Sequence, residues 1–281
     1  MFARARMLIP FLLGSVLLLR AEAVEFRVAY EDKDTPDHTG ASELIPDDPG
    51  ISVEMVKLIE KKVPDLRIVF SRKPWLRCLA ELESGAADGI FASSFKLERL
   101  KNGAYPMKDG KDDRTYRIDT KSYSLYKRKD SAVEWNGRSF SGLQLEIAAM
   151  RGYAIVEDLK KMGVAVSVVD KSESALRMLL AGRIDGFAQL TEVGDYTLKK
   201  YPEFQTITKV QPPLVTKDYY LQISHPFMAK YPELSWKIWK ALAEIRQSES
   251  ERLTLKYINR YSDTAAEAAV PAPARQPVPA S

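Results

Sequence analysis

Residues 79–89 read LAELESGAADG, and residues 176–186 read LRMLLAGRIDG. At a constant offset, the two segments carry leucines at the same two positions and end in the same G-x-x-D-G pattern. Leucines three residues apart indicate a helix, and the glycine after them suits the left-handed position at which helices often end. Apolar residues follow each copy and suit a buried strand. A chance recurrence of a common turn is the alternative, but the matched leucines favour a repeated helix–turn–strand unit, once in each half of the chain.

The rest of the chain also alternates between predicted strands and helices. Strands are expected at residues 24–30, 66–70, 89–92, 143–149, 165–169, 186–188 and 205–210, and helices at residues 51–62, 74–85, 155–162, 172–181, 192–201, 232–247 and 250–261. Such alternation predicts an α/β fold in which mainly parallel sheets are flanked by helices.

Two extended segments, residues 114–128 and 218–223, are predicted to cross between two lobes and to serve as a hinge. Because the first half looks incomplete without the closing helices, we expect lobe 1 to comprise residues 24–125 and 216–263. Lobe 2 is then residues 126–215. A groove between two such lobes is a common place for a small molecule, since ligand sites favour domain interfaces.

Both ends of the chain are predicted to lie outside this fold. Residues 1–23 combine a basic start, a short apolar run and the small-residue pattern Ala21-Glu22-Ala23, which is typical of a cleaved signal peptide. The mature chain is therefore expected to begin at Val24 and to be exported. Residues 264–281 are rich in alanine and proline and are predicted to be disordered.

Composition argues against several kinds of chemistry. The formal net charge is +4 over 281 residues, without long runs of like charge, so nothing indicates a nucleic-acid partner. Cys78 is the single cysteine and falls on the apolar face of its predicted helix. His38 and His225 are the only histidines, which excludes a multi-histidine metal site. Because no phosphate-loop, dinucleotide or nucleophile-elbow motif occurs, we expect no cofactor and no metal.

The chain resembles the family 3 extracellular solute-binding proteins, the periplasmic receptors best known for amino acids. The segment that carries the resemblance is PWLRCLAELESGAADGIFASSFKLER at residues 74–99, followed by AYPM at 104–107. Weaker matches lie at residues 150–153, 182–187 and 218–224. The Pro-Trp-x-Arg start is most similar to a less characterised branch of the family. The resemblance implies a two-lobed fold that closes on a small polar solute.

In lobe 1, the resemblance assigns ligand contacts to residues of the motif. Arg99 aligns with the arginine that clamps a ligand carboxylate, although a solvated surface arginine is the alternative. Ser93 and Ser94 follow the strand and either hold the same anion or cap a turn. Trp75 either lines the groove or packs in the core, and Tyr30 ends the first strand where the family often has a groove-lining aromatic residue.

In lobe 2, the matching strand-to-helix turn carries Arg151, Gly152 and Tyr153. Backbone N–H groups at a helix start bind anions, and the glycine permits close approach. The tyrosine either contacts the solute or is buried for structural reasons.

Two departures from the family pattern bear on the ligand. The resemblance places an ammonium-binding aspartate at position 190, which is Leu190 here, and Glu192 is the only nearby substitute. Lys96 stands where a hydroxyl residue is usual and adds positive charge near Arg99. Both departures suggest a more acidic or non-amino ligand.

The sequence therefore predicts a monomeric periplasmic solute-binding protein for an amino acid or organic acid. The resemblance further implies delivery to an inner-membrane ABC permease. Two alternatives stay open: an exported enzyme on the same scaffold, such as a dehydratase, or a sensor or accessory module that passes its occupied state to a partner. Turnover of the bound solute would distinguish the enzyme from the receptor.

Overall fold

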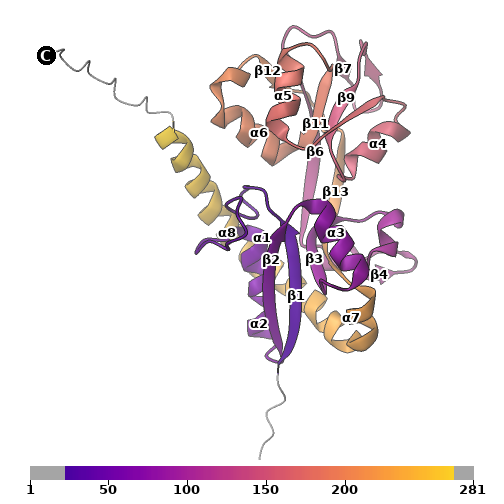
Figure 1. The fold of residues 1–281 in the computed structure, drawn as a ribbon, viewed down its shortest axis with the longest axis vertical. Helices are drawn as coiled ribbons and strands as arrows, with labels where there is room; N and C mark the ends of the chain where they lie inside the picture. The colour runs from indigo at the N-terminus through magenta and orange to yellow at the C-terminus, as the bar shows by residue number, and fades with distance from the viewer. Residues whose placement is uncertain (1–22, 269–281) are drawn as a thin grey trace, which may run out of the picture.

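Two α/β lobes joined by a narrow waist make up the protein (Figure 1). The computed structural model describes the backbone of residues 23–268 and the side chains of residues 23–257. The predicted signal peptide before residue 23 and most of the predicted tail lie outside the described residues. Within the described part, no helix has both the length and the apolar character needed to cross a membrane.

Lobe 1 is built on three parallel strands in the order β2-β1-β3. Their bounds are β1 Val24–Glu31, β2 Leu66–Lys73 and β3 Gly89–Ser94, with the short strands β4 Met107–Lys108 and β5 Lys111–Asp112 beyond them. The helices of this lobe are α1 Ile51–Lys57, α2 Ile59–Lys62, α3 Trp75–Ser84, α7 His225–Lys230 and α8 Pro232–Ala268, with 3-10 turns at Leu97–Lys101 and Arg114–Tyr116.

Lobe 2 repeats the parallel arrangement, with strand order β10-β9-β11. Its strands are β7 Glu134–Trp135, β8 Phe140–Ser141, β9 Ile147–Met150, β10 Val166–Val169, β11 Gly186–Leu190 and β12 Ile207–Lys209. Its helices are α4 Ile155–Lys161, α5 Ser172–Leu180 and α6 Thr191–Lys200, with a 3-10 turn at Pro202–Phe204.

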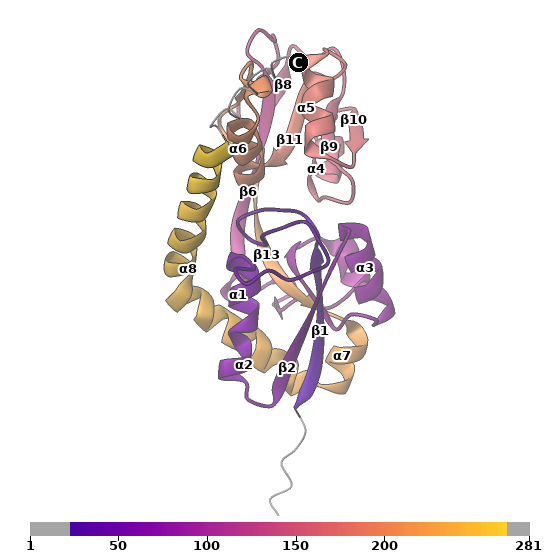
Figure 2. The ribbon, with the colours of Figure 1, turned by 60° about the vertical axis from the view of Figure 1, so that its left-hand side comes forward.

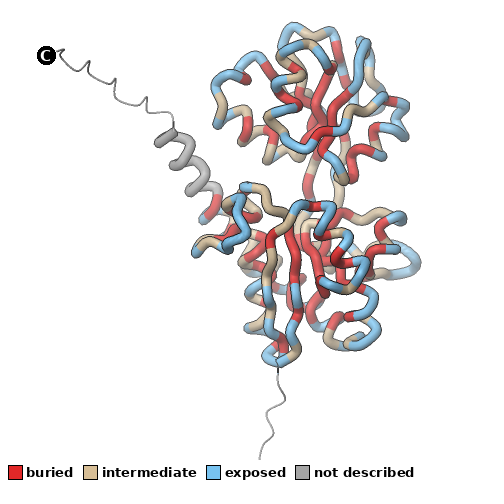
Figure 3. The backbone as a smooth tube through the Cα atoms, in the orientation of Figure 1, coloured by how far each residue is buried: buried red, intermediate tan, exposed pale blue. Residues whose placement is uncertain are grey.

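Two long antiparallel strands, β6 (Asp119–Arg128) and β13 (Val215–Ile223), connect the lobes. They join both halves into one nine-stranded sheet in which β6 pairs with β11 and β13 with β3. The sheet is therefore mixed rather than purely parallel, because each crossing strand runs against its neighbours. Buried residues concentrate along the strands of each lobe (Figure 3). The predicted two-lobed α/β fold is confirmed. The exact lobe boundaries stay predictions.

The repeated helix–turn–strand unit is present as α3–β3 and as α5–β11. Gly85 and Gly182 have φ angles of 75° and 64°, in the left-handed region that favours glycine. Asp88 accepts hydrogen bonds from the backbone and side chain of Arg27. Asp185 accepts from the backbone N–H groups of Gln144 and Leu145, in the loop before β9. Both aspartates thus hold turns in place.

Several elements differ from the prediction, among them the following three. The first crossing strand begins at Asp119 rather than residue 114, because Asp113 caps a 3-10 turn by accepting from the Thr115 N–H. The strand expected at residues 143–149 is confined to Ile147–Met150. The two closing helices are one, α8, because no proline or glycine interrupts residues 248–250. This helix also includes residues 264–268, which the sequence assigned to the tail.

Helix α8 packs against α1 and α2 of lobe 1 and passes α6 of lobe 2 (Figure 2). The indole of Trp239 is fully buried and donates a 2.7 Å hydrogen bond to the carbonyl of Leu221 in β13. Cys78 is a free, buried thiol, as its place on the apolar face predicted.

Candidate functional site

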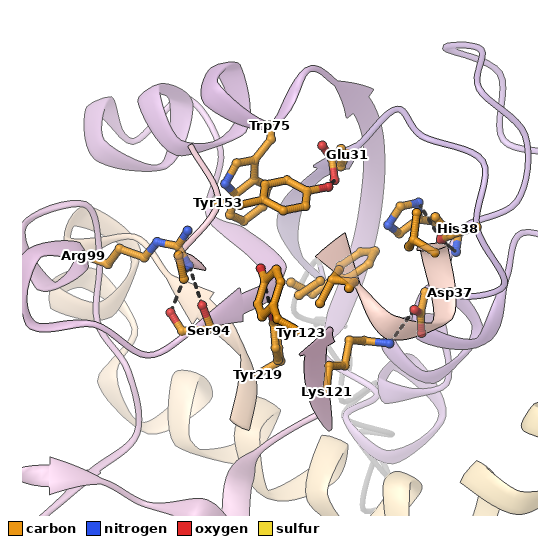
Figure 4. A pocket seen from close by; sticks show the side chains of 16 residues that line it. Glu31, Asp37, His38, Trp75, Ser94, Arg99, Lys121, Tyr123, Tyr153 and Tyr219 are labelled. Carbon is orange, nitrogen blue, oxygen red and sulfur yellow. Dashed lines mark hydrogen bonds and ion pairs between the residues drawn. The ribbon is translucent and has the colours of Figure 1, made fainter. Parts of the chain in front are cut away.

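A cavity lies between the lobes, beside the crossing strands. Its empty volume is about 600 Å³, which includes the part that is open to solvent. Side chains from both lobes and from β6 and β13 form its walls (Figure 4). The walls carry four charged groups, Glu31, Asp37, Arg99 and Lys121, and five aromatic rings, those of Trp75, Phe91, Tyr123, Tyr153 and Tyr219. Groups of both lobes therefore face one space, an arrangement typical of a small-molecule site.

Arg99 projects into one end of the cavity from the 3-10 turn after β3 (Figure 4). Its Nη1 donates to the carbonyl and the hydroxyl of Ser94, each at 3.0 Å, and its Nη2 donates to the carbonyl of Gly152 at 3.1 Å. Its guanidinium carbon lies 5.5 Å from the centre of the Trp75 ring. The residue is only 8% exposed, yet among the described residues no carboxylate forms an ion pair with it. Its hydrogen-bond partners are all neutral.

Gly152 brings lobe 2 against lobe 1. Its φ of 76° suits glycine, and its carbonyl accepts from the Trp75 indole N–H at 3.2 Å as well as from Arg99. A Cβ atom at this position would lie 2.6 Å from Cδ2 of Leu76 and 3.2 Å from Cδ1 of Trp75. Only a residue without a side chain lets the two lobes approach this closely.

Tyr153 forms a second contact between the lobes. Its hydroxyl donates to Oε2 of Glu31 at 2.6 Å and accepts from the ammonium of Lys33 at 3.2 Å. The Lys33 ammonium also lies 2.7 Å from Oε1 of Glu31 and 4.7 Å from the centre of the Tyr153 ring. Burial and the charge of Glu31 raise the pKa of Tyr153 well above its usual value, so its phenol stays protonated.

An ion pair between Lys121 and Asp37 closes the other end of the cavity. The Lys121 ammonium lies 2.5 Å from Asp37 and 3.1 Å from Asp119, and the Ser52 hydroxyl donates to Asp37 at 3.1 Å. Burial opposes both charges, but the neighbouring aspartates raise the pKa of Lys121, and Lys121 lowers that of Asp37. The pair is therefore ionised at neutral pH.

Two tyrosine hydroxyls lie near Arg99 at the centre of the site (Figure 4). The Tyr219 hydroxyl of β13 donates to that of Tyr123 of β6 at 3.1 Å. Burial raises the pKa of both phenols, although the Arg99 charge opposes this. Both stay protonated. One hydrogen bond joins the two hydroxyls and uses one of their two protons, so the pair keeps a second proton for which no acceptor is found among the described residues.

Backbone strain marks the strand that leads to Arg99. Ala92 in β3 lines the cavity and has a φ of 56°, in the left-handed region that alanine rarely adopts. Such strain persists only where the surrounding structure holds it, and it often marks binding sites. Ser94 follows two residues later and contacts Arg99.

Four of the residues singled out from the sequence line the cavity: Trp75, Ser94, Arg99 and Tyr153. Gly152 is not a lining residue, but its carbonyl accepts hydrogen bonds from Trp75 and Arg99, which are. The others lie elsewhere. Tyr30 is fully buried behind the cavity, where its ring stacks on Phe91, and the Ser93 hydroxyl contacts Tyr105 and Gln222 in the core.

The remaining two predicted residues point away from the cavity. Arg151 is exposed and pairs with Asp170 at 2.8 Å. Glu192 lines a separate hollow between α6 and α8, on the far side of Lys121, where burial raises its pKa.

The structure adds residues that sequence reasoning did not select. Among them are Glu31, Asp37, His38, Phe91, Lys121, Tyr123, Val193 and Tyr219. A signal existed for two of them, because Lys121 and Tyr123 are two residues apart on one face of a strand predicted to cross the groove. Within the described residues, no three His, Cys, Asp or Glu side chains gather in a way that could hold a metal ion.

No model of a known protein family and no curated protein sequence matches this chain. Solved structures do match it in fold. A histidine kinase sensor domain with similarity to periplasmic binding proteins has a TM-score of 0.66 and 17% identity, with 84% of this chain and 97% of that one covered.

Two further neighbours are amino-acid-binding proteins. An amino acid ABC transporter substrate-binding protein from Streptococcus pneumoniae, bound to L-arginine, has a TM-score of 0.60 and 15% identity, covering 88% of this chain and 97% of that one. An ancestral amino-acid-binding protein, a precursor of cyclohexadienyl dehydratase, has a TM-score of 0.61 and 16% identity, covering 83% and 94%. At such identities the likeness establishes the two-lobed fold of periplasmic binding proteins.

Proposed function

We propose that this protein is an exported receptor that captures a small carboxylate-bearing solute between its two lobes. The observation that carries the proposal is the buried guanidinium of Arg99, which faces the cavity without an ion-pair partner among the described residues. Burying an uncompensated charge is costly, so a counter-ion is expected at this point. A carboxylate is the natural one, because it accepts two parallel hydrogen bonds from guanidinium.

The walls of the cavity explain how binding would be coupled to closure. Residues of both lobes line it, and the lobes meet through Gly152 and Tyr153. A solute that contacts both lobes favours the closed arrangement, since only differential contacts shift such an equilibrium. Capture with closure is the behaviour expected of a receptor.

The charged groups favour a receptor over an enzyme. General acid–base catalysis needs a group that can exchange a proton with the bound molecule. Glu31 is bound by Lys33 and Tyr153, and Asp37 by Lys121 and Ser52, so the oxygens of both cavity carboxylates are already engaged by groups of the protein.

We further propose that the protein acts as a monomer in the periplasm and delivers its solute to an inner-membrane ABC permease. The signal-peptide pattern at residues 1–23 and the likeness in fold to an ABC transporter substrate-binding protein support this assignment. Sequencing the N-terminus of the periplasmic form should begin at Val24. A cytoplasmic protein that retains Met1 would contradict export.

Native mass spectrometry of the protein purified without unfolding tests the receptor itself. The wild type should carry a small acid that Arg99→Ala loses. Arg151→Ala, which removes an exposed arginine that points away from the cavity, should retain it. The solute should leave the protein chemically unchanged on dilution. A solute without an acidic group would contradict the proposal, and release of an altered product would establish an enzyme instead.

A further inference from the structure

We infer, on the basis of the function proposed above, that the captured solute is an aromatic monocarboxylate without an ammonium group, a molecule of the benzoate type. The inference joins three observations about the cavity: how its carboxylates are paired, where it offers donors to an anion, and what its remaining walls are made of.

The carboxylates of the cavity are already neutralised by lysines of the protein. Glu31 has the Lys33 ammonium at 2.7 Å and the Tyr153 hydroxyl at 2.6 Å, and Asp37 has the Lys121 ammonium at 2.5 Å. Leu190, at the end of β11, presents an apolar side chain to the same space. An α-ammonium group entering this cavity would lose its water without gaining an unpaired carboxylate, which is strongly unfavourable.

The donors for an anion converge from lobe 1 and the crossing strands. Arg99 supplies the positive charge, and the hydrogen-bonded hydroxyls of Tyr123 and Tyr219 keep one proton without an acceptor among the described residues. Lys121, the other cation of the cavity, is paired with two aspartates. The site therefore provides for one carboxylate rather than two.

The remaining walls suit a flat apolar body. Phe91 stacks on Tyr30 with ring centres 5.2 Å apart and an interplanar angle of 23°, and Leu190 and Val193 add aliphatic surface. The Trp75 N–H and the Tyr153 O–H are both used in contacts between the lobes, so these residues offer their rings rather than their polar atoms. Aromatic rings pack well against such surfaces in offset or edge-on arrangements.

The same rings argue against a quaternary ammonium ligand such as a betaine. Aromatic cages attract cations to their ring faces. Here Arg99 already lies 5.5 Å from the Trp75 ring, and Lys33 lies 4.7 Å from the Tyr153 ring. A further cation would meet like charge at both rings.

Calorimetric titration of the full mature chain, stripped of bound solute and refolded, tests the inference. The probes are benzoate, 4-hydroxybenzoate, benzamide, L-phenylalanine, L-glutamate and glycine betaine. We expect at least one of the two benzoates to bind at least tenfold more tightly than either amino acid or the betaine. Benzamide, which keeps the ring but lacks the charge, should bind at least tenfold more weakly than benzoate.

A gain-of-function variant provides a second test of the inference. Leu190→Asp places an unpaired carboxylate in the cavity, so it should weaken benzoate binding at least tenfold and increase the affinity for L-phenylalanine. Leu255→Asp makes the same exchange on α8 at a leucine that is 57% exposed, and it should change neither affinity.

The outcomes separate this inference from the proposed function. If an amino acid or the betaine binds the wild type most tightly and Arg99→Ala abolishes that binding, the receptor stands and the aromatic monocarboxylate is overturned. If no probe binds and the co-purified solute has no carboxylate, both fail. Equal binding of benzoate and benzamide would also overturn the inference, because the anion would then contribute nothing.

Discussion

Arg99 combines a buried charge with neutral partners, and that combination defines the site at the scale of single residues. Its two hydrogen bonds to Ser94, within lobe 1, fix the guanidinium without neutralising it. Fixed donors lose little freedom when an anion arrives, so the side chain is organised for binding in advance. The aromatic residues around it exclude water and strengthen the attraction.

Replacing Arg99 should therefore be costly for binding. Truncating one partner of a buried charge pair typically costs about 2–5 kcal/mol. Arg99→Ala should thus weaken the affinity for the carboxylate solute by roughly 30-fold or more. Arg99→Lys should restore part of the loss, since it keeps the charge but not the two-pronged geometry. Calorimetry with the solute measures both, and wild-type affinity in a folded Arg99→Ala protein would show that the arginine is not the anchor.

The Asp37–Lys121 pair should matter for stability. Removing one partner of a buried pair costs about 3–5 kcal/mol, and because Asp119 also contacts Lys121, we expect Asp37→Asn to lower the free energy of unfolding by about 3 kcal/mol. Asp37→Asn with Lys121→Met should recover much of this, because no unpaired ammonium remains buried. Urea unfolding at neutral pH measures the three proteins, and a double variant no more stable than the single one would contradict a role for the pair.

The same pair predicts a pH dependence. The pKa of Asp37 in the folded protein lies below its ordinary value of 3.8. Its contribution to stability is therefore complete above that value and is lost as the pH falls through the lower pKa. Urea unfolding should be measured from pH 5 down to the lowest pH at which both proteins still fold. Over this range the free energy of unfolding should fall more for the wild type than for Asp37→Asn. Parallel losses in the two proteins would show that Asp37 does not contribute.

At the scale of elements, the strand-to-helix turn between β9 and α4 is the part of lobe 2 that reaches lobe 1. Gly152 makes this approach possible, as its carbonyl receives two donors and its missing side chain leaves room for Leu76. The turn thus lines the cavity through Tyr153 and holds lobe 2 in contact with lobe 1.

Gly152→Ala should interfere with closure. The new methyl group would lie 2.6 Å from Leu76, so the lobes could not meet as they do here, and we expect at least a tenfold loss of solute affinity. Gly163→Ala is the matched control, because Gly163 has a φ of 79° and nothing within 4 Å. Both variants should lose about 1–2 kcal/mol of stability from the strained backbone.

Calorimetry and thermal unfolding compare the two glycine variants. If both lower the affinity equally, backbone strain rather than the contact between the lobes would explain the effect.

Prediction from the sequence succeeded for those elements that hydrophobic periodicity and turn residues determine. The helix–turn–strand repeat, the parallel strands and the crossing strands follow from alternating patterns and glycine positions. The sequence predicts two closing helices, at residues 232–247 and 250–261, but no residue between them breaks a helix, and α8 is continuous.

The site could be predicted only in part, for a reason that lies in strand geometry. Neighbouring residues of a strand face opposite sides, so an error of one residue changes the assigned face. In β1 the sequence predicts a ligand contact at Tyr30, but its neighbour Glu31 lines the cavity. In β3 it predicts contacts at both Ser93 and Ser94, but only Ser94 lines the cavity. Asp37 and Lys121 are 84 residues apart in the chain and meet only through tertiary structure, so no local pattern reveals their pairing.

At the scale of the whole molecule, β6 and β13 are the two strands that link the lobes within the described residues, and both continue into the sheets on either side. Such a connection permits one lobe to rotate against the other while each keeps its core. The contacts of Gly152 and Tyr153 with lobe 1 show the lobes brought together around the cavity.

Solute binding should consequently compact the molecule. Small-angle X-ray scattering should give a smaller radius of gyration at saturating solute than in the stripped protein, because the closed arrangement gains contacts from both lobes. Arg99→Ala at the same solute concentration serves as the control and should keep the larger radius. An unchanged radius in saturated wild type would indicate a rigid module.

The central claim is that a carboxylate-bearing solute lies between the lobes against Arg99. A crystal structure of the protein with its co-purified solute tests it most directly. The account predicts a carboxylate whose oxygens lie about 2.7–2.9 Å from the Arg99 guanidinium nitrogens, with side chains of both lobes around the rest of the molecule. A solute bound outside this cavity, or one that leaves the Arg99 guanidinium in contact only with Ser94 and Gly152, would contradict it.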